Sequence, residues 1–322
     1  MQFEKGQIAL SFLQNFPGML KTTVYKIVFF AFAFFVFNTS FSQPDTVLFQ
    51  SKILTPPQSF TDGVEGPAVD NEGNLYAVNY HHEGTIGKIT TTGEASIFVE
   101  LPTGSIGNGI RFNNTGTMFV ADYKKHNILQ IDMKTKLVTV FAHDDGMVQP
   151  NDIAITKWNT FYASNPDWKN GTGSIWYANK KGKLTPLETQ MGTTNGIEVS
   201  PDSKKLYLNE STQRKIWVYD ISKKGKIKNK RLLTEFPDFG MDGMRCDANG
   251  NLYIARYGKG VVAIVSPGGK LLREIKLSGQ KPTNVAFGGT DGKTVYVTLQ
   301  DTGNIETFRT DTPGQEWINT KR

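Results

Sequence analysis

Carboxylate and carboxamide side chains recur at one position of a repeated sequence pattern. Each stands eleven or twelve residues before an aromatic residue that follows a turn. The six residues at this position, called the ring residues below, are Glu65, Asn108, Asn151, Asn195, Asp242 and Asn284. They offer hard oxygen ligands, with no His or Cys in the same register, and two carboxylates nearly neutralise a divalent cation. The set therefore predicts a Ca²⁺ site, with Mg²⁺ or Mn²⁺ as alternatives. Zn²⁺ suits it less because zinc more often recruits imidazole or thiolate.

Asn-Gly and Asp-Gly pairs also have an ordinary structural explanation. They are common turn formers, and any one of these motifs is accounted for by a turn. Their recurrence in the same register in six repeats favours a shared site over six independent turns.

The repeats predict the elements that position these side chains. The pattern is a turn, an apolar residue, an aromatic residue and a further apolar stretch. Its aromatic residues are spaced by 43, 43, 45, 46 and 43 residues, and they are Tyr76, Phe119, Tyr162, Tyr207, Tyr253 and Tyr296. Each period holds several short β-rich runs and no helical periodicity, which is typical of an all-β, six-bladed β-propeller with four-stranded blades. The first strand of each propeller blade lines the central channel, so the ring residues should face the axis at one rim.

The two ends of the propeller are expected to meet in the last blade. After Tyr296 the sequence offers two strands, which leaves this blade without an outer strand. Residues Thr46–Leu54 are predicted to form a strand that belongs to none of the six repeats. We expect them to pair with Asn304–Arg309 and close the ring, since an unpaired sheet edge is a liability. The propeller is predicted over residues 43–310, followed by a polar C-terminal tail at 311–322.

The N-terminal segment predicts export. Lys21 and Lys26 precede the apolar run Ile27–Phe37, and small residues at Ser40 and Ser42 suit cleavage before Gln43. Residues 1–42 are interpreted as a signal peptide, with Met19 as a possible start of translation and a retained anchor as the alternative. The mature protein is then periplasmic or secreted. The single cysteine, Cys246, excludes an internal disulfide and is expected in the core.

Several motifs carry a resemblance to a known family. EGP, PND, NGI followed by SPDSKKLY, DGM followed by DANGNLY, and PTNVAFGG followed by DGKTVYVT occur in this order. Over about residues 60–300 the chain resembles the senescence-marker-protein/gluconolactonase family, which includes regucalcin and sugar-lactone lactonases. The resemblance implies a six-bladed propeller with one divalent metal in its channel.

The resemblance also implies roles for individual residues. It places metal ligands at Glu65, Asn195 and Asp242, with Asn151 binding directly or through water. It gives Asp242 the further role of general base. Asn108, Gln149 and Asn284 are expected to contact the substrate. Gln149 stands where the sugar-lactone branch has Arg, and Met241 stands where a Pro is usual. The missing Arg leaves recognition of a polyhydroxylated sugar acid open.

These features together predict a metal-dependent hydrolase of lactones or related esters. The sequence has no G-x-S-x-G nucleophile motif, which argues against a serine hydrolase. The net charge of +6 is spread out, and its densest basic run, Lys223–Arg231, reads as a solvated hairpin rather than a nucleic-acid site. We expect a small-molecule substrate and neither a nucleic-acid partner nor membrane association after cleavage. The sequence does not fix the oligomeric state. The alternative is a non-catalytic propeller that binds a ligand or partner and uses Ca²⁺ only structurally.

Overall fold

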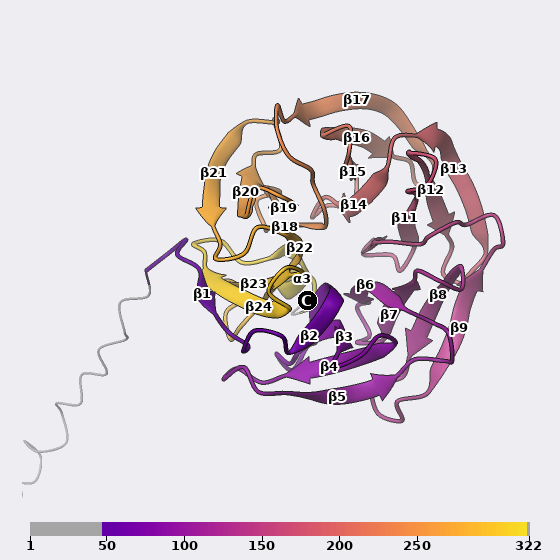
Figure 1. The fold of residues 1–322 in the computed structure, drawn as a ribbon. Helices are drawn as coiled ribbons and strands as arrows, with labels where there is room; N and C mark the ends of the chain where they lie inside the picture. The colour runs from indigo at the N-terminus through magenta and orange to yellow at the C-terminus, as the bar shows by residue number, and fades with distance from the viewer. Residues whose placement is uncertain (1–46, 321–322) are drawn as a thin grey trace, which may run out of the picture. The chain divides into compact units, whose positions relative to one another are not determined.

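The computed structural model describes residues 47–320 of the chain. These residues form six antiparallel sheets of four strands each, arranged as blades around a central channel (Figure 1). The prediction of a six-bladed β-propeller is therefore confirmed. The segment that we interpret as a signal peptide lies outside the described residues. Within 47–320, no helix has both the length and the apolar character that a membrane crossing requires.

Each blade is a meander that begins with the strand nearest the channel. The strands of the first three blades are β2 (Phe60–Val69), β3 (Leu75–Tyr80), β4 (Thr85–Ile89) and β5 (Ala95–Glu100); β6 (Gly107–Phe112), β7 (Met118–Asp122), β8 (Asn127–Ile131) and β9 (Val138–His143); β10 (Ile153–Ile155), β11 (Phe161–Asp167), β12 (Thr172–Ala178) and β13 (Leu184–Met191). Those of the last three are β14 (Thr194–Val199), β15 (Lys205–Glu210), β16 (Lys215–Ile221) and β17 (Ile227–Glu235); β18 (Met244–Cys246), β19 (Leu252–Arg256), β20 (Val261–Val265) and β21 (Leu271–Lys276); β22 (Pro282–Gly288), β23 (Thr294–Leu299), β24 (Asn304–Arg309) and β1 (Lys52–Ile53).

The hydrophobic core lies between blades. In the described part of the chain, six clusters of buried apolar residues each join one blade to the next around the ring. All six repeat aromatics lie on the second strand of a blade and are buried. The regular spacing that defines the repeats is thus the spacing of residues that pack blade against blade. Cys246 is buried in β18, as expected for a core residue.

Residues from both ends of the propeller share the last blade. β1 pairs antiparallel with β24, opposing Lys52 to Thr307 and Ile53 to Glu306. The regular strand is shorter than the predicted Thr46–Leu54, although Leu48 also bridges to Arg309. Beyond β1, the hydroxyl of buried Thr55 accepts a hydrogen bond from the backbone N–H of Ile305 at 2.9 Å.

Irregular pairing shapes the inner strands at the ring positions. The β2–β3, β6–β7, β14–β15 and β22–β23 ladders each shift register around their ring residue. In the other two blades, Asn151 and Asp242 precede the short strands β10 and β18. Bulges of this kind redirect a side chain away from the normal pleat. Four of the six motifs carry glycine after the ring residue, and at Gly66 and Gly243 a neighbouring inner strand leaves no room for a Cβ.

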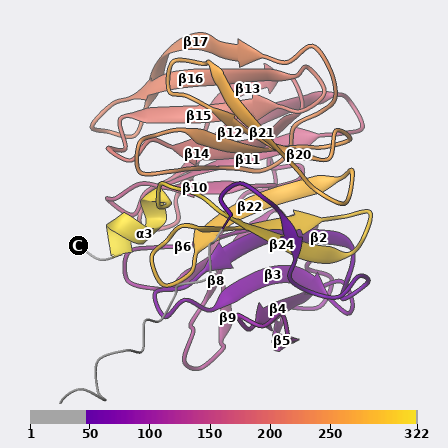
Figure 2. The same ribbon diagram turned by 90° about the vertical axis from the view of Figure 1, so that its left-hand side faces the viewer.

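The C-terminal residues dock against the propeller. The segment expected as a polar tail contains the short helix α3 (Gln315–Thr320), on the face turned away from the viewer in Figure 1 (Figure 2). Gly314 bridges to Asp247, and the buried Gln315 side chain donates to the Val199 carbonyl at 2.8 Å. The helix therefore lies across the far end of the channel.

Thr55→Val tests the junction between the two ends of the propeller. Valine keeps the shape of threonine but leaves the buried Ile305 N–H without an acceptor, which costs about 1–3 kcal/mol. We expect the melting temperature to fall by a few degrees in a thermal denaturation scan. Thr92→Val, on an exposed turn, is the matched control and should change little. Equal melting temperatures for the two variants would contradict the importance of this junction.

Candidate metal centre

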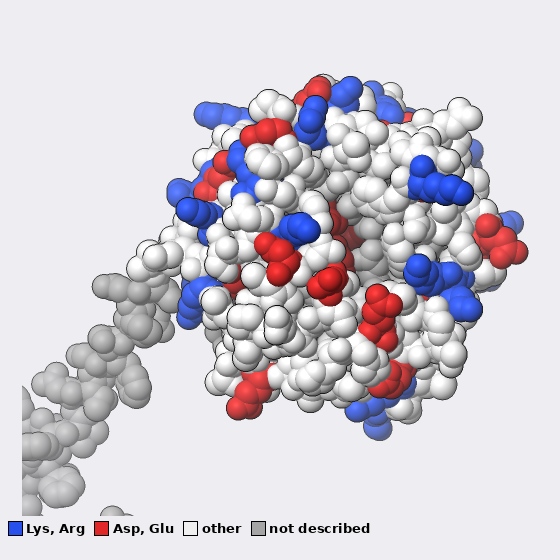
Figure 3. Space-filling view, viewed as in Figure 1, with Lys and Arg blue, Asp and Glu red and all other residues white. Residues whose placement is uncertain are grey.

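A cavity of about 630 Å³ opens at one end of the channel. Figure 3 shows it as a hollow at the centre of this face, with acidic atoms inside. Five of the six ring residues line it, and they are Glu65, Asn108, Asn151, Asn195 and Asp242. They come from five different blades. The propeller thus brings side chains that are up to 177 residues apart in sequence to one site.

Glu65 presents one free carboxylate oxygen. Its Oε2 accepts hydrogen bonds from the backbone N–H of Gly66 and from the Asn284 side-chain amide, the latter at 2.9 Å. Its Oε1 is buried and has no hydrogen-bond partner. A buried oxygen without a donor is costly, and such atoms often mark the place of a bound ion or water.

Asn195 and Asp242 complete the centre of the site. The Asp242 carboxyl is hydrogen bonded to the Asn195 side chain and lies close enough to Glu65 for the two acids to repel each other. The Oδ1 atoms of Asn195 and Asn108 are buried and unpartnered, like Oε1 of Glu65. Two carboxylates and several amide oxygens therefore converge without enough donors, which fits a hard divalent cation such as Ca²⁺. Among residues 47–320, no group of three or more His, Cys, Asp and Glu side chains is placed to hold a metal, so amide oxygens must complete any ligand set here.

Burial makes the charged forms of both carboxyls costly. It raises the pKa of Glu65 to about 7, with repulsion from Asp152 adding to the effect. It also raises the pKa of Asp242 well above its ordinary value, and repulsion from Glu65 is the second cause. Two acids held together in a buried site favour sharing a proton when no cation is near.

The remaining predicted site residues lie at different depths. Asn151 lines the cavity, and its backbone carbonyl accepts a hydrogen bond from the Gly109 N–H at 2.8 Å. Asn284 is fully buried and does not line the cavity. Its placement supports holding Glu65 rather than contacting a substrate. Gln149 is not a lining residue either, but its side chain accepts a weak hydrogen bond, at 3.4 Å, from the backbone N–H of Trp168, which does line the cavity.

The walls of the cavity contain residues to which the sequence assigned no role. Tyr123, Lys124 and Tyr257 join Trp168 around the opening. Tyr123, Trp168 and Tyr257 each directly follow the second strand of a blade, so their position after the repeat aromatic was the available signal. A second group lies deeper in the channel, where Arg111, Asp152 and Arg245 are buried in one cluster of ion pairs. Charged residues within otherwise apolar inner strands, as in GNGIRF and DGMRC, were the available signal.

Comparisons with known proteins agree with this architecture. Residues 63–301 match the family described as the SMP-30/Gluconolactonase/LRE-like region. The chain belongs to the SMP-30/gluconolactonase/LRE-like family. A gluconolactonase of Zymomonas mobilis is 26% identical over 286 residues, covering 78% of this chain and 79% of the relative. The diisopropyl-fluorophosphatase of Loligo vulgaris is 26% identical over 286 residues, covering 79% and 91%. In fold, the chain is similar to a regucalcin structure from Agrobacterium tumefaciens, with a TM-score of 0.72, 21% identity, and coverage of 84% and 97%.

The acid pair predicts an unusual pH dependence for the metal-free protein. Because the folded state binds protons more tightly than the unfolded state, the pair's contribution to stability is present at low pH and lost as the pH rises. For Glu65 the loss falls between its ordinary pKa of 4.5 and about 7. In the presence of a chelator, we expect Asp242→Asn to melt above the parent at pH 8 and close to it at pH 5.

The exposed carboxylate of Glu83 at the mouth of the cavity provides the control for this comparison. Glu83→Gln should track the parent at both pH values. A parent protein whose melting temperature is as high as that of Asp242→Asn at pH 8 would show that the acid pair carries no cost.

Proposed function

We propose that this protein hydrolyses lactones or related esters, using a divalent cation held by Glu65, Asn151, Asn195 and Asp242, with Ca²⁺ as the preferred ion. The observation that carries the proposal is the convergence of these side chains in one cavity, with buried oxygens of Glu65 and Asn195 lacking partners. Membership of a family that includes a gluconolactonase and a diisopropyl-fluorophosphatase supports hydrolytic chemistry.

The ligand set divides into charged and neutral oxygens. Glu65 and Asp242 contribute the two carboxylates that balance a divalent charge, and the amides of Asn151 and Asn195 contribute neutral oxygens. When bound, the cation supplies positive charge that polarises the substrate carbonyl and stabilises the negative charge developing on its oxygen. The hydrogen bonds from Gly66 and Asn284 hold one oxygen of Glu65 and leave the other without a partner, so that it would be available to a cation.

Asp242 is placed to act on water. It is only partly buried and lines the cavity, so its carboxylate is reachable from solvent. It accepts a proton as water adds to the carbonyl carbon. The bond from that carbon to the ring oxygen then breaks, and the departing oxygen takes up a proton to give the hydroxy acid. Asn195, hydrogen bonded to Asp242, keeps the carboxylate oriented for the transfer.

The cavity suits a small cyclic ester. Its volume of about 630 Å³ is in the range of pockets for small ligands. Trp168 and the two tyrosines supply flat apolar surface, while Ser211, Thr212 and Gln300 supply hydrogen-bonding groups. A ring with several hydroxyls can therefore bind by stacking and by hydrogen bonds to the wall.

A lactone panel tests the proposal directly. Purified protein is assayed on sugar lactones, alkyl lactones and aryl esters after treatment with EDTA and after return of Ca²⁺, Mg²⁺, Mn²⁺ or Zn²⁺. We expect activity that is lost with EDTA and restored best by Ca²⁺. Tight Ca²⁺ binding without hydrolysis of any member of the panel would favour a non-catalytic binding propeller instead.

Asp242→Asn tests whether Asp242 is a metal ligand and general base or only forms a turn. Asparagine keeps one oxygen and suits a turn, but it loses the charge and the proton acceptor. We expect weaker Ca²⁺ binding by calorimetry and hydrolysis reduced by about 10²-fold or more. Glu83→Gln, which removes a carboxylate from the mouth of the same cavity, should leave turnover within about twofold. Full activity of Asp242→Asn at saturating Ca²⁺ would exclude the catalytic role.

A further inference from the structure

The channel behind the candidate metal centre holds a second, cationic layer. Arg111 and Arg245 each follow a ring residue by three positions in the sequence, and both are buried. Asp152 lies between them, with carboxylate–guanidinium distances of 3.0 Å to Arg111 and 3.4 Å to Arg245. Two buried guanidinium groups need more than one carboxylate to be neutralised.

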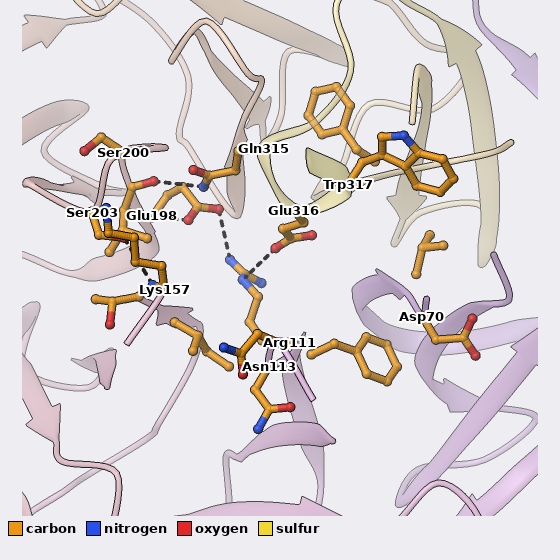
Figure 4. Close-up of a pocket in the computed structure, with 17 residues that line it drawn as sticks. Asp70, Arg111, Asn113, Lys157, Glu198, Ser200, Ser203, Gln315, Glu316 and Trp317 are labelled. Atoms are coloured by element: carbon orange, nitrogen blue, oxygen red, sulfur yellow. Dashed lines mark hydrogen bonds and ion pairs between the residues drawn. The ribbon is translucent and has the colours of Figure 1, made fainter. Parts of the chain in front are cut away.

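The C-terminal helix supplies a further carboxylate. Oε1 of Glu316 lies 3.6 Å from Nε of Arg111 and 3.8 Å from Nε of Arg245, and neither Nε has a hydrogen-bond partner. Figure 4 shows Glu316 and Glu198 on either side of the Arg111 guanidinium. Glu198 lies 3.8 Å from Arg111, and burial raises its pKa to about 7. For Arg245, in contrast, Glu316 raises the pKa more than Glu198 does. Glu316 is therefore the carboxylate that serves both arginines from outside the ring of blades.

The arginine layer is connected to the metal centre by specific hydrogen bonds. Arg245 donates to Oδ1 of Asn284 at 3.0 Å. The backbone N–H of Val285 donates to the same oxygen at 2.9 Å. Together these bonds orient the amide so that its Nδ2 donates to Oε2 of Glu65 at 2.9 Å. Oε1 of Glu65, a residue that lines the cavity, is then the carboxylate oxygen left without a partner.

We propose that Glu316 is a positioning residue for the metal centre, acting through Arg245 and Asn284 on the carboxylate of Glu65. Helix α3 lies across the far end of the channel and holds the arginine layer in place with this charge. Without Glu316, Arg245 is drawn toward Asp152, which is its remaining close counter-charge, and its bond to Asn284 weakens. The Asn284 amide is then held by the Val285 N–H without the arginine, and its hydrogen bond to Glu65 weakens, which leaves the Gly66 N–H as the stronger donor to that carboxylate. The inference rests on the proposed function in so far as Glu65 is a metal ligand.

Glu316→Gln tests the proposal by metal affinity rather than by activity. Partners of metal ligands typically contribute about 10–100-fold to affinity, and Glu316 acts one step further out. We expect the Kd for Ca²⁺, measured by calorimetry on the purified full-length protein, to rise about fivefold or more. Asp311→Asn is the matched control, since it removes an exposed charge from the same C-terminal segment without touching an arginine. Its Kd should equal that of the parent.

A double-mutant cycle distinguishes positioning from general destabilisation. Asn284→Ala should weaken Ca²⁺ binding by itself, and in that background Glu316→Gln should have no further effect on the Kd. A change of less than twofold in the single variant overturns the proposal, and so does an equal loss in both backgrounds. If Glu316→Gln does not fold, Glu316→Asp replaces it, and an unchanged Kd for that variant overturns the proposal too. A parent that binds no Ca²⁺ would instead remove the proposed function, and with it this inference.

Discussion

The close approach of six inner strands at the channel axis is the constraint on which the rest of the structure depends. Where Gly66 and Gly243 follow their ring residues, the neighbouring strand occupies the place of a side chain. Only a residue without a Cβ fits at these two positions, and beside Gly66 the ladder is irregular at the same point. The preceding side chain is thereby directed into the cavity. The apolar clusters between blades fix the spacing that makes this approach possible.

The channel is organised in two layers of different charge. The outer layer holds Glu65 and Asp242 with amide oxygens, and the inner layer holds Arg111 and Arg245 with Asp152. Asn284 lies at the boundary, accepting from an arginine on one side and donating to Glu65 on the other. One amide side chain therefore connects the inner layer to the outer one by hydrogen bonds. Asn284 does not line the cavity, and its structural role is to hold the Glu65 carboxylate.

Function and stability are opposed at this site. Bringing two carboxyls together in a buried place raises the pKa of both and leaves oxygen atoms without donors. A packed core would remove such a group, whereas a cation site requires it. The cost is tolerated because the interblade clusters and the sheet ladders stabilise the propeller independently of the axis.

The sequence by itself determined the repeat, the number of blades and the register of the ring residues. A local pattern repeated six times reports the same strand position each time, so Tyr76 and its counterparts identified the core and Glu65 and its counterparts identified the axis. Only the tertiary structure decided which ring residues reach the cavity. Asn284 accepts a hydrogen bond from buried Arg245 in the neighbouring blade and donates one to Glu65 in the first blade. These contacts join residues that are far apart in sequence, so the local repeat pattern could not predict them. The position of Glu316 also came only from the tertiary structure, because a six-residue helix at the end of the chain carries no repeat signal. Contacts with Val199, Asp247 and the two arginines hold this segment.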